Sequence, residues 1–366
     1  MATYRNIRKV LNLPTLSASP SSGVNGEMYF NTGDLALYIY DGAWKKVTQS
    51  SIVTYKFPGS NDGYAHGGKG SGAAFQSVDK WSFSSDGNAS SSHTAYSSVF
   101  NALGTVQSTS HGYTVSGATA SSWAAALTYS QKYAFASTTT AQASTGYTAV
   151  RKTGTTQSST AYYMMGSADA QKDIQKATFA ADGTASDVGD MLATAPAGGN
   201  YQQHTIGLVY GDTIGYTCSD PSSDSIDYHN KMNKFTFASE GNSTVMSTTF
   251  PDTTMYLPAP CSSETDGYII GGSPNLQGTG TAGGIRKFVF ATEANVTDGG
   301  GDLVSFAYTN NGNSSTTNGY IYGTCSGSSG SNQIQKFSFP GSSNSTDIGD
   351  LSVAHTSRAP IPGSQH

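Results

Sequence analysis

Gly267-Tyr268-Ile-Ile-Gly271-Gly272, with Ile285-Arg-Lys287-Phe-Val-Phe290 a few residues later, is the stretch that decides the fold. Both blocks recur along the 366-residue chain, and the tyrosine of the first block stands at positions 64, 113, 163, 216, 268 and 320. Successive tyrosines are therefore between 49 and 53 residues apart. A period near 50 residues in strand-type sequence is typical of β-propellers, in which each repeat supplies one supersecondary unit.

The second block has a lysine at its third place and a phenylalanine at its sixth in all six copies, which begin at Val78, Ser130, Ile174, Met232, Ile285 and Ile334. Successive strand residues point to opposite faces, so the fourth and sixth places share one face. These places usually hold aromatic side chains, which predicts a strand that packs against a neighbouring blade. For the lysine we expect a stem along the strand with its ammonium at the polar side, rather than a ring of functional charges.

Turn residues and a third block complete the repeat. Ser85-Asp86-Gly87-Asn88 and similar stretches follow the phenylalanine and suit a tight hairpin, because Gly and Asn accept positive φ. Three repeats then carry Asp, Gly and Asp followed by Met191, Leu303 or Leu351, and we expect this Leu or Met to begin an outer strand. One repeat thus supplies about four strands, which cannot cover their own apolar faces alone.

The sequence therefore predicts an all-β chain in which residues 51–366 form a propeller of six blades, with seven blades as the alternative. Closing the ring removes exposed sheet edges, so we expect the segments Ile52–Phe57 and Leu351–Thr356 to share one blade. The order of the blocks, from Tyr with paired glycines to an aromatic strand and then a Leu-bearing strand, resembles the kelch repeat. That resemblance implies kelch-like blades.

Residues 1–50 lack the repeat and are predicted to form a small β module. Gly26–Thr32 and Leu35–Tyr40 have the pattern of two strands, an Asp-Gly turn follows, and a third strand carries a tryptophan; an extended arm precedes them. So small a sheet is marginally stable alone. We expect it to self-associate, or to dock on another protein, through Tyr29, Phe30, Leu37, Tyr38 and Trp44.

The pattern of this module, Gly-Glu, Asn-Thr, Leu-Tyr and Asp-Gly-x-Trp, is similar to short β modules near the N-termini of tail fibres and adhesins of tailed phages. With the repeats, the chain resembles virion structural proteins of tailed phages, particularly those that infect marine cyanobacteria. The resemblance implies a location on the tail or particle surface and attachment to other virion proteins through residues 1–50. It also implies a homo-oligomer, with a trimer favoured.

Composition excludes several classes of protein. With 19 basic and 24 acidic residues the net charge is −5, and no basic stripe is present to bind nucleic acid. The first residues lack the apolar segment of a signal peptide, and no run of ~18 apolar residues occurs, which predicts synthesis in the host cytoplasm without membrane insertion. Three scattered cysteines form neither a disulfide framework nor a thiolate metal site, and we expect buried free thiols.

No catalytic constellation stands out, and we expect no enzyme activity, no cofactor and no metal. A sialidase binds its substrate carboxylate with three arginines, whereas this chain has five, two of them in the N-terminal arm. The seven histidines are dispersed, without the Tyr, His and Cys cluster of a kelch-type copper oxidase. Asp pairs such as Asp187 and Asp190 recur with the repeat, which indicates turn caps rather than a pair of glycosidase carboxylates.

The loops between the tyrosine strand and the lysine strand differ most between repeats, and we expect all six on one face of the disc. A solvated loop is one interpretation of their polar side chains. The other is contact with a host-surface glycan, or a protein receptor, which makes the chain a receptor-binding tail fibre. A capsid-surface decoration without a receptor is the alternative function, and a glycan-cleaving propeller a remote one. The predicted ligand-binding residues are Trp123, Asp224, Asp227, Tyr228 and His229.

The strand assignment of the second block can be tested by truncating its last aromatic residue. Replacing Phe237 or Phe290 by alanine should lower the free energy of unfolding by ~3–5 kcal/mol, because each change leaves a cavity in a packed core. Thermal unfolding measures the loss. A melting temperature unchanged by both substitutions would contradict the assignment.

Overall fold

The computed structural model describes residues 13–34, 36–47, 59, 61–68, 75–99, 104–115, 127–147, 154–165, 173–191, 206–218, 232–248, 250–251, 258–272, 283–305, 312–323, 325–326, 329–339, 343–353 and 363–365. None of these residues is in a helix, so the described part of the chain has no helix that could cross a membrane. The predicted all-β class is confirmed. The chain divides into two compact units, Met1–Thr54 and Tyr55–His366.

The N-terminal unit is one four-stranded sheet. Its strands lie in the order β1 (Thr15–Leu16), β2 (Met28–Asn31), β3 (Ala36–Tyr40) and β4 (Trp44–Lys46). The sequence predicted the last three strands, and the arm before them adds β1, which pairs parallel with β2. Backbone bonds of 2.8 Å from Phe30 N–H to Pro14 and from Thr32 N–H to Leu16 fix this fourth strand.

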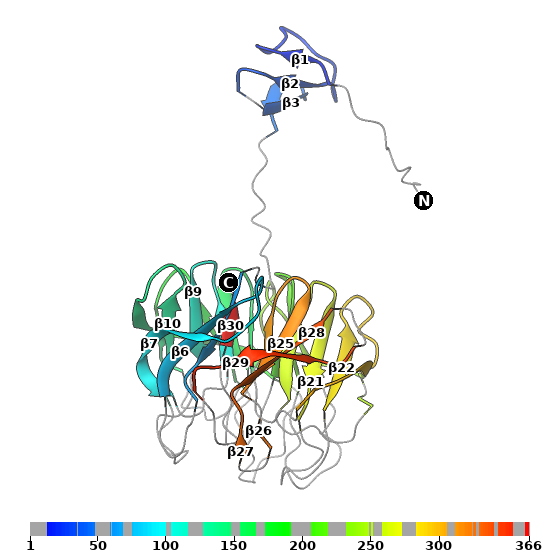
Figure 1. Ribbon diagram of the computed structural model, residues 1–366. Coiled ribbons are helices and arrows are strands. Elements are labelled where there is room, and N and C mark those ends of the chain that lie inside the picture. The colour runs from blue at the N-terminus through cyan, green and yellow to red at the C-terminus, as the bar shows by residue number, and fades with distance from the viewer. Residues whose placement is uncertain are drawn as a thin grey trace. The chain divides into compact units, whose positions relative to one another are not determined.

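The described part of the second unit contains six four-stranded antiparallel sheets, which are numbered here in chain order (Figure 1). Sheet 1 contains β30 (Gly363–Gln365), β5 (Asp62–His66), β6 (Phe75–Ser82) and β7 (Ser90–Val99). Sheet 2 contains β8 (Gly104–Gln107), β9 (His111–Val115), β10 (Tyr129–Ala134) and β11 (Thr140–Thr145). Sheet 3 contains β12 (Gly154–Gln157), β13 (Ala161–Met165), β14 (Asp173–Thr178) and β15 (Ser186–Asp190).

The second half of this unit repeats the same order of strands. Sheet 4 contains β16 (Ile206–Tyr210), β17 (Ile214–Cys218), β18 (Met232–Thr236) and β19 (Thr244–Val245). Sheet 5 contains β20 (Ala259–Ser262), β21 (Asp266–Ile270), β22 (Gly284–Val289) and β23 (Thr297–Asp302). Sheet 6 contains β24 (Gly312–Ser314), β25 (Asn318–Tyr322), β28 (Gln333–Ser338) and β29 (Thr346–Asp350), and β26 (Cys325–Ser326) and β27 (Ser329–Gly330) form a separate hairpin.

The first-position strands of the six sheets contact one another in a closed cycle, in the order β8, β12, β16, β20, β24, β30 and back to β8. Glycine permits this approach, because a Cβ added to Gly207 of β16 would lie 1.6 Å from the Thr155 carbonyl oxygen of β12. Side chains also bond across the cycle, since Gln107 N–H donates to Gln157 Oε1 at 2.8 Å. The six sheets are thus arranged in a cycle.

The two ends of the repeat region share one sheet, in which Gly363–Gln365 supplies a strand that was not predicted. Gly363–Gln365 pairs with β5 and completes sheet 1, whereas Leu351, Ser352 and Val353 lie outside any strand. The segment Ile52–Phe57 lies outside the described residues. Ser352 instead binds the carboxylate of Asp79 in sheet 1 through its N–H at 2.7 Å and its hydroxyl at 2.6 Å.

The expectation that Leu or Met begins the outer strand is wrong. The Asp-Gly-Asp block itself forms the outer strands β15, β23 and β29, and Met191, Leu303 and Leu351 follow those strands as buried residues. The reason is a turn-capping bond: in β15 the Asp187 carboxylate accepts the Gly189 N–H at 3.1 Å where the pairing with β14 shifts register. The same bond occurs in β23 and β29.

The outer strands of sheets 2, 3, 5 and 6 are hydrogen-bonded to the turn of the next sheet. At sheet 3 the N–H of Gly241 donates to Val188 at 2.7 Å, and that of Ser243 donates to Asp190 at 2.8 Å. Asn242 Oδ1 in the same turn accepts the Asp190 N–H at 3.0 Å. These bonds use backbone groups that an exposed sheet edge would leave unpaired.

Neighbouring sheets are joined by aromatic pairs. The repeat tyrosine of each sheet is at most 2% exposed and lies against the phenylalanine at the sixth place of the next sheet's block. Ring centroids are 4.5 to 5.5 Å apart in all six pairs, which are Tyr64–Phe135, Tyr113–Phe179, Tyr163–Phe237, Tyr216–Phe290, Tyr268–Phe339 and Tyr320–Phe83. The predicted aromatic face of the lysine strand is therefore an inter-sheet contact.

Candidate functional site

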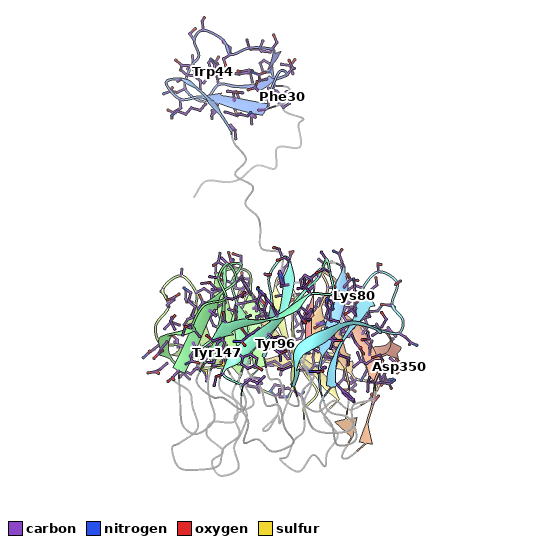
Figure 2. The ribbon with its side chains drawn as sticks, turned by 90° about the vertical axis from the view of Figure 1, so that its left-hand side faces the viewer. Phe30, Trp44, Lys80, Tyr96, Tyr147 and Asp350 are labelled. Atoms are coloured by element: carbon purple, nitrogen blue, oxygen red, sulfur yellow. The ribbon has the colours of Figure 1, made fainter. Side chains whose placement is uncertain are left out.

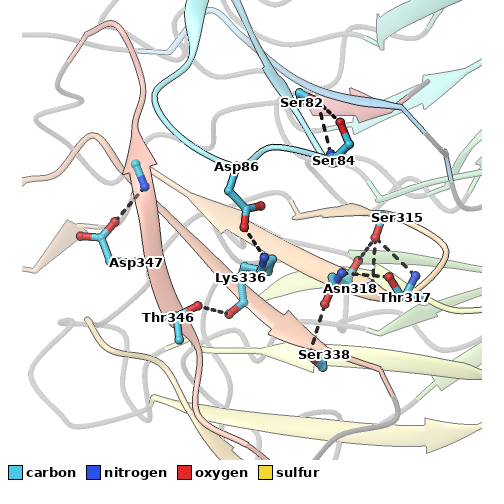
Figure 3. A network of polar contacts seen from close by, with 11 residues as sticks. Ser82, Ser84, Asp86, Ser315, Thr317, Asn318, Lys336, Ser338, Thr346 and Asp347 are labelled. Carbon is cyan, nitrogen blue, oxygen red and sulfur yellow. Dashed lines mark hydrogen bonds and ion pairs between the residues drawn. The ribbon is translucent and has the colours of Figure 1, made fainter.

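The repeated lysines form ion pairs that bridge the sheets. In four sheets the lysine binds an acid in the turn of the next sheet, and the last of these pairs, Lys336 with Asp86, joins sheet 6 to sheet 1 (Figure 3). The lysine side chains in these four pairs are only 21% to 29% exposed, so most of each side chain is covered. The other three pairs are Lys132–Asp182, Lys176–Glu240 and Lys234–Glu293.

Two sheets lack the acid in the next turn, and both replace it from their own sheet. The position three residues after the phenylalanine is Thr138 in sheet 2 and Ser342 in sheet 6, where the other repeats have Asp or Glu. Lys80 therefore pairs with Asp62 at 2.9 Å, and Lys287 pairs with Asp266 at 3.3 Å. Asp62 and Asp266 immediately precede the Gly-Tyr pair, a position that holds no acid in the other four repeats.

Three of the four acids in the bridging pairs occupy strained backbone positions. Asp86, Glu240 and Glu293 have φ between 49° and 55°, and they are the only residues other than glycine with positive φ in the described part of the chain. Such a conformation costs on the order of 1 kcal/mol for a residue with a Cβ. Burial would raise the pKa of the Glu293 carboxyl, but bonds from Lys234 and Tyr216 outweigh it and hold that pKa below its ordinary value. The six repeated lysines and their ion pairs thus have a structural role.

The two sides of the ring differ in the length of their connections. The turns between the first and second strands of sheets 2 to 6 have three residues each, at 108–110, 158–160, 211–213, 263–265 and 315–317. In four of them a serine hydroxyl accepts N–H groups of its own turn, as Ser315 does from Thr317 and Asn318 (Figure 3). The second-to-third connections are longer and vary from the 7 residues 166–172 to the 13 residues 219–231.

All five predicted ligand-binding residues belong to these longer connections, and Trp123, Asp224, Asp227, Tyr228 and His229 lie outside the described residues. The strands that carry the connections are described. They end at equivalent register positions in each sheet, so the connections leave the ring on one side.

The five residues predicted for attachment divide between two faces of the N-terminal sheet. Tyr29 is 1% exposed and packs on Tyr38 and Trp44 at ring distances of 5.2 and 4.9 Å. Ser19 of the arm binds the Tyr29 hydroxyl at 2.6 Å, so the arm lies over this face. Strand alternation places half-buried Phe30 and Leu37 on the opposite face; Figure 2 labels Phe30 and Trp44.

The contact between sheets 1 and 2 departs from the repeat. Val78 pairs with His93 in β7, at the register position that holds Gly189 in β15. His93 Nε2 donates to the carbonyls of Ala134 and Ser137 in sheet 2, at 2.8 and 2.6 Å. His66 is 1% exposed, shares a hydrogen bond with Thr114 through Nδ1, and has no partner for Nε2. Burial, with a smaller contribution from His93, lowers the pKa of His66 to about 3.

A groove of about 260 Å³ opens on the outer side of sheet 3. It is lined by the Lys176–Glu240 ion pair and by four hydroxyl side chains, namely Ser144, Thr178, Thr184 and Ser186. Ser144 is 1% exposed and lies in the wall of the groove. The only sequence signal for this groove is a serine at the position of a repeated glycine, and that position can be recognised only when the strand register is known.

The remaining reactive side chains have structural contacts. Cys261 is a buried free thiol, as expected, and burial raises its pKa to about 12. The side chains of Cys218 and Cys325 lie outside the described residues. Among the residues that the structure describes, no group of three His, Cys, Asp or Glu side chains is placed to hold a metal ion.

The buried neutral state of His66 predicts a specific pH dependence of stability. Its pKa is about 3 in the folded chain and ~6.5 when unfolded, so below pH ~6.5 the unfolded state takes up the proton first. This group then lowers the free energy of unfolding by up to about 1.4 kcal/mol per pH unit, down to pH ~3. Urea unfolding of wild type and His66→Gln should give curves that diverge on acidification. Parallel curves would contradict the prediction.

Asp62 pairs with Lys80 in place of an acid at Thr138, and this can be tested by moving the negative charge from position 62 to position 138. Asp62→Asn removes the partner of Lys80 and should cost up to about 1 kcal/mol, since the pair is partly exposed. Adding Thr138→Glu supplies the acid where other repeats have it and should restore the urea midpoint. Thr138→Gln is the matched control. Equal midpoints for the Glu and Gln double variants would show that the position carries no charge pairing.

Comparison with known proteins adds no family. A scan against models of known protein families found no match, and a search of curated proteins found none either.

Proposed function

We propose that this chain is a structural protein of a phage virion, of the tail fibre or adhesin type. The six sheets are the blades of a kelch-like β-propeller whose variable loops bind a host-surface receptor, in the first place a glycan. The N-terminal unit attaches to other virion proteins and joins copies of the chain, with a trimer favoured. The chain acts as a binding and assembly protein rather than as an enzyme.

One observation carries the proposal: the two sides of the ring are built differently. Three-residue turns, most of them bonded internally by a serine, recur on one side, while the connections on the other side vary in length and sequence. A rigid scaffold that holds variable loops on one side is a common construction of binding proteins. Trp123, Asp224, Asp227, Tyr228 and His229 all belong to that loop side.

The N-terminal unit supports the assembly part of the proposal. Its Tyr29 face is covered by its own arm, whereas its other face presents half-buried Phe30 and Leu37 beside Val47, which is 42% exposed. A sheet of this size gains stability when such a face is covered. Attachment through this face leaves the ring loops available for a receptor. A decoration of the capsid surface, without receptor binding, is the second candidate, because the same unit could anchor the chain there.

Immunolabelling of virus particles locates the chain. An antibody raised against the full chain should label the tail or its fibres in electron micrographs. Label spread over the capsid would instead support the decoration function, and unlabelled particles would overturn the virion proposal.

Adsorption to host cells then tests the receptor-binding loops. Phage carrying Trp123→Ala or Tyr228→Ala should adsorb several-fold more slowly, because an aromatic anchor contributes much of the binding energy at such contacts. Tyr96→Ala is the matched control, since it removes a tyrosine that is 51% exposed on the outer strand β7 (Figure 2). Unchanged adsorption of both loop variants would overturn the receptor proposal, and turnover of host polysaccharide by the purified chain would point to the enzyme alternative.

A further inference from the structure

The groove beside sheet 3 lies at a junction between sheets that lacks a glycine repeated at three other junctions. In sheets 3, 5 and 6 the outer strand carries Gly189, Gly301 or Gly349 against the turn of the next sheet. A Cβ at these glycines would lie 2.1 to 2.4 Å from backbone atoms of that turn. Any other residue at this position therefore forces the turn to shift.

Sheet 2 has Ser144 at that position. The equivalence follows from a conserved backbone bond. At sheet 3 the residue after the glycine, Asp190, accepts the N–H of Ser243, which is the sixth residue after Phe237. At sheet 2 the residue after Ser144, Thr145, accepts at 2.7 Å the N–H of Ala185, which is the sixth residue after Phe179. The turn is shifted there: the outer-strand N–H of Thr145 donates to Gly183, whereas at sheet 3 the turn glycine Gly241 is the donor. The groove lies beside this shifted turn.

The groove contains groups suited to an uncharged polyhydroxylated ligand. Thr178, Thr184 and Ser186 supply exposed hydroxyls, which both donate and accept. The bond between Lys176 and Glu240 uses one of three lysine N–H donors and one of two carboxylate oxygens, which leaves a donor and an acceptor side by side. An anionic ligand would face Glu240 and a cationic one Lys176, so a neutral ligand fits best.

Size and lining define the ligand further. A volume of about 260 Å³ corresponds to roughly eight waters, the scale of a single sugar ring rather than of an oligosaccharide. Ala177 and Val188 offer small apolar contacts for the C–H groups of such a ring. Ser144 is buried in the wall of the groove.

We propose that this groove binds one neutral hexose unit, as a carbohydrate subsite on the wall of the ring. The site is separate from the variable loops and does not depend on the function proposed above. The lining lacks an aromatic ring for stacking among its described residues, so binding to a single sugar is weak.

Saturation-transfer NMR on the full chain tests the subsite with methyl α-glucoside, methyl α-galactoside and methyl α-mannoside as probes. At least one of them should receive saturation from the protein. Ala181→Tyr places a large side chain into the groove from an exposed turn position and should abolish the transfer. Ser239→Tyr is the matched control, because Ser239 holds the equivalent turn position of sheet 4 and does not line the groove.

The outcomes separate clearly. Loss of transfer in Ala181→Tyr with retention in Ser239→Tyr, at equal melting temperatures, supports the subsite. Equal transfer in both variants places the sugar elsewhere and overturns it, as does the absence of transfer from all three hexosides. Phage adsorption to host cells reports on the loops, so a failure of the subsite leaves the receptor proposal unaffected.

Discussion

The aromatic contact of one buried tyrosine with the phenylalanine of the next sheet is the interaction on which the cyclic arrangement depends. It occurs at all six junctions, including the junction of Tyr320 with Phe83, where sheet 6 meets sheet 1. No single sheet can bury its own aromatic face, so each repeat is stable only with its neighbours in place. The lysine bridges and the covered outer strands are built around this contact.

Ion pairs of the repeated lysines also connect neighbouring sheets, and every repeated lysine keeps an acidic partner. Where the next turn has Thr138 or Ser342 instead of an acid, Asp62 or Asp266 appears in the lysine's own sheet. A half-buried ammonium without a partner is costly, so each lost partner is replaced from a nearby position. The repeats of this chain can therefore be aligned with one another in the way that related sequences are aligned. Positions that differ from the common pattern, such as His93 and Ser144, indicate where the contact between two sheets has changed.

The repeat was visible in the sequence, and it predicted the all-β class, the aromatic strand and the turn-capping role of Asp187. It did not predict β30, because Gly363–Gln365 has no apolar alternation and joins β5 only through the cyclic order. The position of Met191 after its strand was missed because the bulge at Gly189 depends on a local bond. The groove was not predicted, because the sequence does not show that Ser144 lies opposite a turn of another repeat. The predicted loop residues remain a prediction.

The completion of sheet 1 by Gly363–Gln365 has a consequence for biosynthesis. Strands β5, β6 and β7 leave the ribosome early, yet the edge of β5 finds its partner only after all other sheets have been made. Until then that edge is open to pairing with another nascent chain, a recognised route to misassembly. Copies translated close together on one message are therefore at risk of exchanging this strand, and slow release of residues 363–365 would lengthen the exposure.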